Sequence, residues 1–231
     1  LLTFNYAGDQ LAGKMAMKMA KKAGMHVLQV VTGEEIKYDP KGEDNKRGLA
    51  GAVPLYHVAA AAARAGKSLE EVAAIAQKYA DSMASITIKS TDATHPQNGM
   101  LFGNLGETDQ MEIGAGQHGE GGGTRVKMMS SKDTIAAVAP KLVEHLKLKK
   151  GDKAFVMING CGATTMMEML VLFNDTVEYL NKLGIEVVAN MVGEVLTVQE
   201  AAGFQLNIAK WDSEMLELWN TPAHTPVFFR E

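Results

Sequence analysis

The sequence predicts an α/β protein in which mixed sheets are flanked by helices and the chain is divided into two α/β domains. Three observations predict this. Short apolar runs of strand length alternate with segments of helical periodicity along most of the 231 residues. The first strand, helix and strand have the spacing of a βαβ unit, which favours a parallel pair. Beyond residue 84, short runs separated by Pro, Asn and Gly change the pattern, so we expect domains at residues 1–84 and 85–231.

The first domain is expected to open with a strand at residues 1–4. Asp9 stands where a helix N-cap belongs, ahead of an apolar series at helical spacing that ends before Gly24. A second strand is expected at residues 25–31. Because the chain begins inside a strand and without an initiator Met, we expect the first domain to lack its N-terminal part.

The remaining elements are predicted from caps and periodicity. An Ala-rich helix ends at Gly66, and Ser68 with Glu71 forms a capping box that opens another helix. Thr165 and Glu168 form a second capping box. The second domain is expected to contain strands at residues 85–89, 100–105, 111–113, 153–159, 185–192 and 204–209, helices at 131–146, from 165 and at 212–219, and a C-terminal tail at 221–231.

Composition excludes several classes of partner. Hydrophobic residues make up 46% and charged residues 22%, as in ordinary globular proteins. A net charge of −4 gives no reason to expect nucleic acid or an anionic membrane as partner. No apolar run approaches the roughly 20 residues that span a bilayer. The single cysteine, Cys161, cannot form an internal disulfide and suits a reducing compartment, so we expect a cytoplasmic protein.

The strongest local signal for chemistry is the segment at residues 112–123, in which six of twelve residues are glycine and one is His118. Glycine permits positive φ and a close approach of backbone to a ligand, at a cost in chain entropy. A neutral imidazole in such a loop can act as a nucleophile, a base or a metal ligand. A flexible connector in which His118 merely packs is the alternative.

Two further readings of this loop stay open. His118 with Glu112 and Glu120 could ligate a metal, although the fixed His and Cys spacings of zinc sites are missing. The backbone at residues 119–123 could cradle an anion, but no Gly-Lys-Ser/Thr sequence follows, so this is not a P-loop. We therefore expect no nucleotide or metal cofactor in this chain; a nucleotide, if used, would lie on a partner.

Two strand-to-helix junctions are also candidates. Ligands of parallel sheets bind beyond the carboxyl ends of strands, so the carboxylate of Asp9 could be a general base, or an ordinary helix cap. Residues 160–165 occupy the same kind of junction and could line a pocket. Within that junction, Cys161 is expected to be a small buried residue rather than a nucleophile.

Five ordered motifs resemble those of the substrate-binding subunit of dihydroxyacetone kinases. They are Asn-Tyr-Ala-Gly-Asp at residues 5–9, Arg-Gly-Leu-Ala-Gly at 47–51, the His118 loop at 111–120, Ile-Asn-Gly-Cys-Gly-Ala-Thr at 158–164 and the segment at 219–226. The resemblance covers essentially the whole chain.

The resemblance implies a role for two residues. In that family a histidine forms a covalent hemiaminal with the carbonyl carbon of dihydroxyacetone, and this role falls on His118. The family's aspartate, which contacts the substrate hydroxyl and helps to deprotonate it, falls on Asp9. The phosphoryl donor of the bacterial form is a separate subunit that carries ATP or ADP with Mg and is charged through the phosphotransferase system. The resemblance also implies a homodimer.

The chain departs from the family in several places. The family segment with its second catalytic histidine would precede residue 1, and Phe4 stands where the family has a substrate-contacting lysine. Gly121 replaces the proline of the histidine motif, and residues 10–13 and 196–200 also differ. The resemblance thus implies a dihydroxyacetone-type kinase subunit. A non-catalytic paralogue that binds a ketose as a sensor or transcriptional coactivator, or a kinase subunit for a related ketose, is the alternative.

Overall fold

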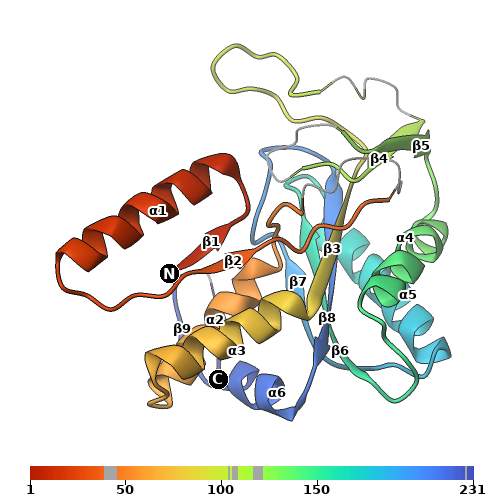
Figure 1. Ribbon diagram of the computed structural model, residues 1–231. Helices are drawn as coiled ribbons and strands as arrows, with labels where there is room; N and C mark the ends of the chain where they lie inside the picture. The colour runs from red at the N-terminus through yellow and green to blue at the C-terminus, as the bar shows by residue number, and fades with distance from the viewer. Residues whose placement is uncertain (39–45, 104, 106–108, 117–121, 227) are drawn as a thin grey trace.

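The centre of the computed structural model is a six-stranded mixed sheet (Figure 1). The structure describes residues 1–38, 46–103, 105, 109–116, 122–226 and 228–231. The strand order is β5-β4-β3-β8-β6-β7, and only β6 and β7 pair in parallel. The strands are β3 (Met83–Lys89), β4 (Gln110–Ile113), β5 (Thr124–Lys127), β6 (Lys153–Gly160), β7 (Glu186–Gly193) and β8 (Gly203–Trp211). The predicted α/β class with a mixed sheet is confirmed.

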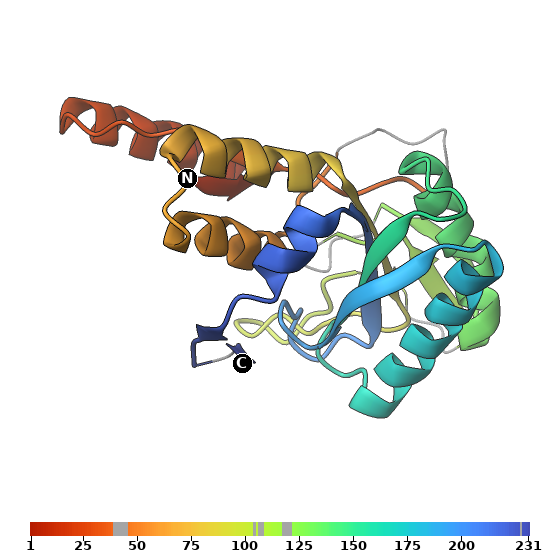
Figure 2. The same ribbon diagram turned by 90° about the horizontal axis from the view of Figure 1, so that it is seen from below.

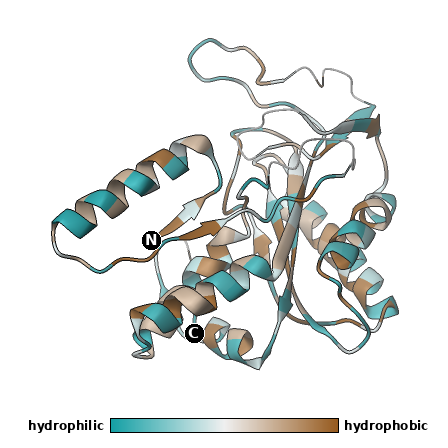
Figure 3. Cartoon of the chain, viewed as in Figure 1, coloured by the Kyte–Doolittle hydropathy of each residue, from teal (hydrophilic) through white to brown (hydrophobic). Residues whose placement is uncertain are grey.

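Helices cover both faces of this sheet, as the view from below shows (Figure 2). One face carries α4 (Ser131–His145) and α5 (Met166–Lys182), and the other carries α2 (Ala52–Arg64), α3 (Leu69–Asp81) and α6 (Ser213–Trp219). Side chains of β6 alternate between the two cores: Val156 and Ile158 face α4 and α5, whereas Phe155 and Met157 face the other three helices. Because helices cover both faces of the sheet, its strands are largely hydrophobic, whereas each helix carries both hydrophobic and hydrophilic residues (Figure 3).

The chain begins with the predicted βαβ unit. β1 (Leu2–Phe4) and β2 (Val30–Thr32) pair in parallel, and α1 (Ala7–Lys22) connects them and projects away from the large sheet (Figure 1). The second strand is shorter than predicted because β1 offers only three residues for pairing. The apolar series that predicted α1 is exposed, since Met15 is 59% and Met19 69% accessible.

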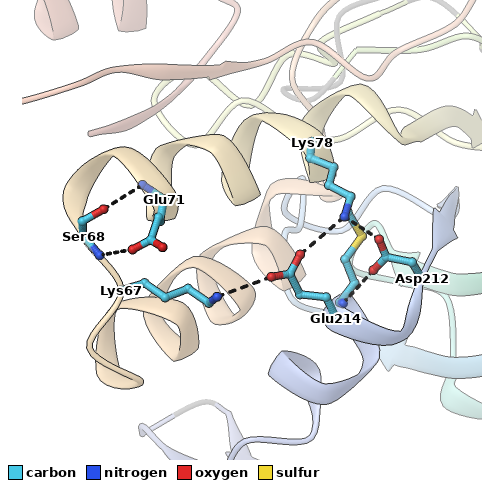
Figure 4. Close-up of polar contacts among 7 residues, drawn as sticks. Lys67, Ser68, Glu71, Lys78, Asp212 and Glu214 are labelled. Carbon is cyan, nitrogen blue, oxygen red and sulfur yellow. Dashed lines mark hydrogen bonds and ion pairs between the residues drawn. The ribbon is translucent and has the colours of Figure 1, made fainter.

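Both predicted capping boxes are present. Ser68 and Glu71 exchange hydrogen bonds between side chain and backbone, with N–O distances of 2.7 and 3.3 Å, and Thr165 with Glu168 does the same. Asp212 caps α6 by accepting from the Met215 amide at 3.0 Å. Figure 4 shows that the same carboxylate also pairs with Lys78 of α3, which ties α6 to α3.

Two local predictions are wrong, and one strand was missed. Asp9 is not the N-cap of α1: the cap residue is Tyr6, and Asp9 lies inside the first turn. The predicted strand at 100–105 is absent among the described residues there, where Leu101 forms only an isolated bridge to Thr94. β5 was not predicted, because its four residues are half exposed and carry two charges at the sheet edge.

Residue 84 lies within β3, and one core cluster combines Leu55 and Tyr79 with Phe155 and Trp211. The division into domains at residues 1–84 and 85–231 therefore runs through packed structure and stays a prediction. Among the described residues, no helix combines the length and the hydropathy needed to span a bilayer.

Candidate functional site

The candidate site begins at the carboxyl ends of β1 and β2. Asn5 follows β1, its amide donates to the Thr32 carbonyl at 2.8 Å, and its side chain donates to the Lys46 carbonyl at 3.0 Å. A cavity of about 400 Å³ lies here, lined among others by Asn5, Gly33, Glu35 and Lys46. The position agrees with the rule that ligands of parallel sheets lie beyond the carboxyl ends of strands.

Asp9 lies in the first turn of α1, above this edge, and is half-buried. Burial, followed by the charges of Glu34 and Asp9, raises the pKa of Tyr56 on α2. The charges of Asp9 and Glu34 thus both act on the Tyr56 hydroxyl. An acidic group in a first helical turn is also stabilised by the helix dipole. Its role as a general base stays a prediction.

A buried polar layer covers the adjoining part of the large sheet. On the sheet face that carries α2 and α3, the strand side chains are apolar next to these helices and become polar toward the carboxyl end of β3. The layer consists of Ser85, Thr87, Lys89, Glu112, Gln205 and Asn207, each at most 4% exposed. Buried polar side chains require partners, so the segments that cover this layer are tightly specified.

The Arg-Gly-Leu-Ala-Gly motif is one of these covering segments. The amide of Leu49 donates to Oε1 of Glu34 at 2.7 Å, and the amide of Ala50 donates to Oε1 of Gln205 at 2.9 Å. Gly51 is required because a Cβ atom there would lie 2.5 Å from Nδ2 of Asn207. The motif is therefore held on the polar layer by its backbone.

Glu34 is a buried carboxyl group at this junction. Burial raises its pKa from 4.5 to about 8, against the opposing effect of backbone donors that include the amide of Leu49. At neutral pH the group is therefore mainly protonated. Segment 34–36 lies alongside β3, with the Ser85 amide donating to the Glu34 carbonyl at 2.8 Å.

Arg47 connects this segment with the His118 loop. Its Nε donates to Oε2 of Glu35 at 2.6 Å, and its Nη2 pairs with the other carboxylate oxygen. The same Nη2 donates to the Gly114 carbonyl at 3.3 Å. A planar guanidinium presents several donors in fixed directions, so one side chain can orient both groups.

The predicted nucleophile His118 lies outside the described residues, as does Glu120. The flanks of its loop are the paired strands β4 and β5. Gly114 and Gly122 adopt φ of +99° and +115°, and a Cβ at Gly123 would lie 2.4 Å from the Ile113 carbonyl oxygen. The expectation that the glycines serve backbone geometry is confirmed at these three positions.

Residues 117–121 lie outside the described residues, so the metal and anion hypotheses stay untested, and only Glu112, Gly122 and Gly123 of these two sets can be described. Glu112 accepts from the Gly123 amide at 2.8 Å and lies 3.7 Å from the Lys89 ammonium, so its oxygens are engaged. The same hydrogen bond directs the Gly123 amide toward a carboxylate rather than an anion site. Within the part of the chain that is described, no three potential metal ligands gather.

The junction after β6 lines a separate cavity, as predicted for residues 160–165. Ala163 and Thr164 border about 390 Å³ on the α4 and α5 face, together with methionines such as Met111 and Met167. Cys161 is 2% exposed, and burial, with the Glu194 charge, raises its pKa to about 12. The prediction of a small buried residue is confirmed, and the thiol is not a nucleophile near neutral pH.

Sequence reasoning missed the polar layer and its ion pairs. A weak signal existed: polar residues recur at every second position from Ser85 to Lys89, and again at Gln205 and Asn207. Such alternation ordinarily predicts a solvent-facing side. Here segments 34–36 and 47–51 lie against Ser85, Gln205 and Asn207 of this layer.

Comparison with known proteins gives close relatives. The family model described as the Dak1 domain matches residues 1–227. Over 215 residues the chain is 36% identical to the dihydroxyacetone-binding subunit DhaK of the PTS-dependent dihydroxyacetone kinase 1 of Listeria innocua serovar 6a. The alignment covers 93% of this chain and 65% of that protein, so the chain spans less than two thirds of the relative's length.

Two solved structures share the fold. The dihydroxyacetone kinase operon co-activator Dha-DhaQ matches with a TM-score of 0.90 at 24% identity, over 96% of this chain and 69% of that one. The dihydroxyacetone kinase of C. freundii matches with a TM-score of 0.85 at 23% identity, over 100% and 41%. The matched family model and the relative at 36% identity together show that the chain belongs to the Dak1 domain family.

Proposed function

We propose that this chain is the substrate-binding part of a dihydroxyacetone kinase and holds a short ketose as a covalent hemiaminal on His118. The observation that carries the proposal is the 36% identity with a subunit named for dihydroxyacetone binding. The glycine-rich segment at residues 112–123 supports it, because it matches the family's histidine signature.

The chemistry needs one nucleophile and hydrogen-bond donors. A nitrogen of neutral His118 attacks the ketone carbon, and the carbonyl oxygen becomes a hydroxyl by taking up the proton that the imidazole loses. No group leaves, so the adduct forms reversibly. Glycerol has no electrophilic carbon and is excluded. Asp9 would accept the proton of the ketose hydroxyl that is phosphorylated.

The proposal includes a second protein. The phosphoryl group would come from a nucleotide-carrying subunit with ATP or ADP and Mg, as the family resemblance implies, and the Listeria relative is named as part of a PTS-dependent kinase. We further propose that the chain acts as a homodimer in the cytoplasm. Two subunits of a kinase divide the reaction: one fixes the ketose, and the other supplies the phosphoryl group.

Carbon NMR with dihydroxyacetone labelled at its carbonyl carbon tests the adduct. The labelled carbon is expected to move from the ketone to the tetrahedral region on binding. His118→Ala should abolish both this signal and binding by calorimetry, and glycerol should not compete. A tetrahedral adduct that persists in His118→Ala would refute the assignment.

Phe4 favours a second candidate function, a ketose-binding sensor or coactivator without catalysis, because the resemblance places a substrate-contacting lysine at this position. A donor-coupled assay separates the two. Phosphorylation of dihydroxyacetone or erythrulose supports the kinase subunit. Ketose binding without turnover, with ketose-dependent binding to a regulator protein, supports the sensor.

A further inference from the structure

A buried ammonium group lies next to the His118 loop. Lys89 is the last residue of β3, and its side chain is only 3% exposed. Its Nζ lies 2.6 Å from Oδ1 of Asp92 and 3.7 Å from Oε2 of Glu112, whose side chains are 1% and 5% exposed. Lysine is almost never fully buried unless it is paired, so the two carboxylates account for its position.

Each carboxylate also binds the backbone of a different segment. The second oxygen of Asp92 accepts from the Leu105 amide at 2.6 Å, and the second oxygen of Glu112 accepts from the Gly123 amide at 2.8 Å. One continuous chain of contacts therefore runs from Leu105 to Gly123 with Lys89 at its centre. Three of its contacts are hydrogen bonds to charged groups, which are about twice as strong as neutral ones, and the contact between Lys89 and Glu112 is an ion pair.

Close packing at both ends leaves little freedom for a different arrangement. A Cβ atom at Gly103 would lie 2.5 Å from Oδ1 of Asp92. At the other end, a Cβ atom at Gly123 would lie 2.4 Å from the carbonyl oxygen of Ile113. Glycine therefore fits at both positions where a side chain would meet the Asp92 carboxylate or the Ile113 backbone.

The charges make the link depend on Lys89. Two carboxylates and one ammonium share a buried site. Removing the ammonium would leave Asp92 and Glu112 buried together without this cation, and desolvation and mutual repulsion would then disfavour both charges. Either the carboxylates take up protons or the site opens to water. Both responses weaken the hydrogen bonds to Leu105 and Gly123.

We propose that Lys89 is a positioning residue of the ligand site. Through its ion pair with Glu112, Lys89 fixes the end of β4 and the backbone of Gly123, where the chain enters β5. The effect on ligand affinity rests on the proposed function, because the segment between Gly114 and Gly122 carries His118. Lys89 does not touch the ligand in this proposal; it acts through Glu112 and Asp92.

Amide hydrogen exchange tests the link without any ligand. In Lys89→Met, exchange at Leu105 and Gly123 is expected to accelerate by about 10–100-fold, as expected for the loss of a charge-assisted hydrogen bond. Amides in the interior of β6 should keep their rates. The matched control is Lys210→Met, which removes another ion pair of the sheet, that with Asp152 at 2.8 Å. Unchanged exchange at both amides in folded Lys89→Met overturns the proposal.

Glu112→Gln covers the case in which Lys89→Met does not fold. Glutamine keeps an acceptor oxygen for the Gly123 amide but no longer attracts the ammonium. Exchange should then accelerate at Gly123 and stay unchanged at Leu105, which Asp92 still holds. Equal behaviour of the two amides in this variant would contradict the described link.

Ligand affinity tests the positioning role. At a temperature well below unfolding, Lys89→Met should bind dihydroxyacetone about 10-fold more weakly, Lys89→Arg should recover to within about 3-fold, and Lys210→Met should match the unmutated protein. Accelerated exchange with unchanged affinity would overturn the positioning role. If the unmutated protein binds no dihydroxyacetone, the proposed function fails, and exchange at Leu105 and Gly123 still decides whether Lys89 holds the two segments.

Discussion

The guanidinium of Arg47 donates to the carbonyl oxygen of Gly114 at 3.3 Å, across 67 positions of sequence. The contact joins two motifs that stand far apart in the chain, the Arg-Gly-Leu-Ala-Gly segment and the His118 loop. Because Glu35 holds the same guanidinium at 2.6 Å from Nε, the direction of the donor toward Gly114 is fixed.

Arg47→Lys should therefore weaken ketose binding although the charge is kept. A lysine ammonium cannot pair with both oxygens of Glu35 and reach the Gly114 carbonyl in the same plane. We expect about a 10-fold loss of dihydroxyacetone affinity by calorimetry, which corresponds to about one charge-assisted hydrogen bond. Arg64→Lys is the control, since Arg64 on α2 donates to the carbonyl oxygen of the exposed Pro222 at 2.9 Å. Equal losses in both variants would show a nonspecific effect.

Glu34 should make stability depend on pH. Burial raises its pKa from 4.5 to about 8, so the folded protein binds a proton that the unfolded chain releases in this interval. Stability from this group is therefore fully present below pH 4.5 and falls as the pH rises to about 8. Glu34→Gln removes this titration. The free energy of unfolding of Glu34→Gln, relative to that of the unmutated protein, should therefore increase by on the order of 3–5 kcal/mol as the pH rises from 4.5 to about 8.

Urea unfolding at pH 5 and pH 8.5 measures this difference. The control is Glu178→Gln on the exposed surface of α5, which should leave the pH dependence as it is in the unmutated protein. The same pH dependence in Glu34→Gln as in the unmutated protein would mean that Glu34 is ionised in the fold at neutral pH.

Asp212 should contribute more as a helix cap than as an ion-pair partner. It accepts from the Met215 amide at 3.0 Å and pairs with Lys78, whose side chain is 49% exposed (Figure 4). Loss of an N-cap costs about 0.5–2 kcal/mol, whereas an exposed ion pair contributes about 0–1 kcal/mol. In urea unfolding, Asp212→Ala should thus be the more damaging change and Lys78→Met the milder one. Because Asp212→Ala removes this ion pair as well, the reverse order would show that Lys78 stabilises the fold through its second pair, with Glu214 at 3.4 Å, and that the cap contributes little.

Local signals predicted the elements but not what covers them. The capping boxes at Ser68 and Thr165 predicted two helix starts correctly, because a cap depends on residues three apart. Asp9 was wrongly expected to cap α1, since Ala7 and Gly8 carry no side-chain signal to show that the helix has already begun.

The burial of Lys89 could not be predicted from its strand. Its partner Glu112 lies 23 positions away in sequence on β4, and only the folded sheet brings the two side chains together. His118 was identified by resemblance and by its glycines. The contacts of Arg47 with Gly114 and of Lys89 with Glu112, on the described flanks of its loop, became evident only from the structure.

The chain alone should not bind ATP. It has no P-loop and no glycine loop of the protein-kinase type with its strand lysine. Titration with a fluorescent ATP analogue and Mg should give no saturable signal. A micromolar dissociation constant would reveal a nucleotide site in this chain and would favour a self-contained kinase.

Phe4 should limit the rate with dihydroxyacetone. Phe4 is the last residue of β1. A Cβ atom at Gly48 would lie 2.5 Å from Cδ1 of Phe4, so the ring packs against Gly48 at the carboxyl end of the strand. The resemblance places a substrate-contacting lysine at this position. Phenylalanine can neither donate a hydrogen bond nor carry charge, and loss of a preorganised donor to developing charge costs about 3–4 kcal/mol, or roughly 10²–10³ in rate.

Phe4→Lys in the full-length protein should accordingly raise turnover of dihydroxyacetone with the donor subunit, by up to about 10²-fold. Phe4→Leu is the matched control: it removes the ring without adding a donor and should not raise turnover. A coupled assay that follows dihydroxyacetone phosphate measures both variants. If the unmutated protein already turns over dihydroxyacetone at about 1–100 per second, an ordinary kinase rate, Phe4 is not limiting and another group must supply the donor. If no variant is active but a regulator protein binds in a ketose-dependent way, the chain is a sensor.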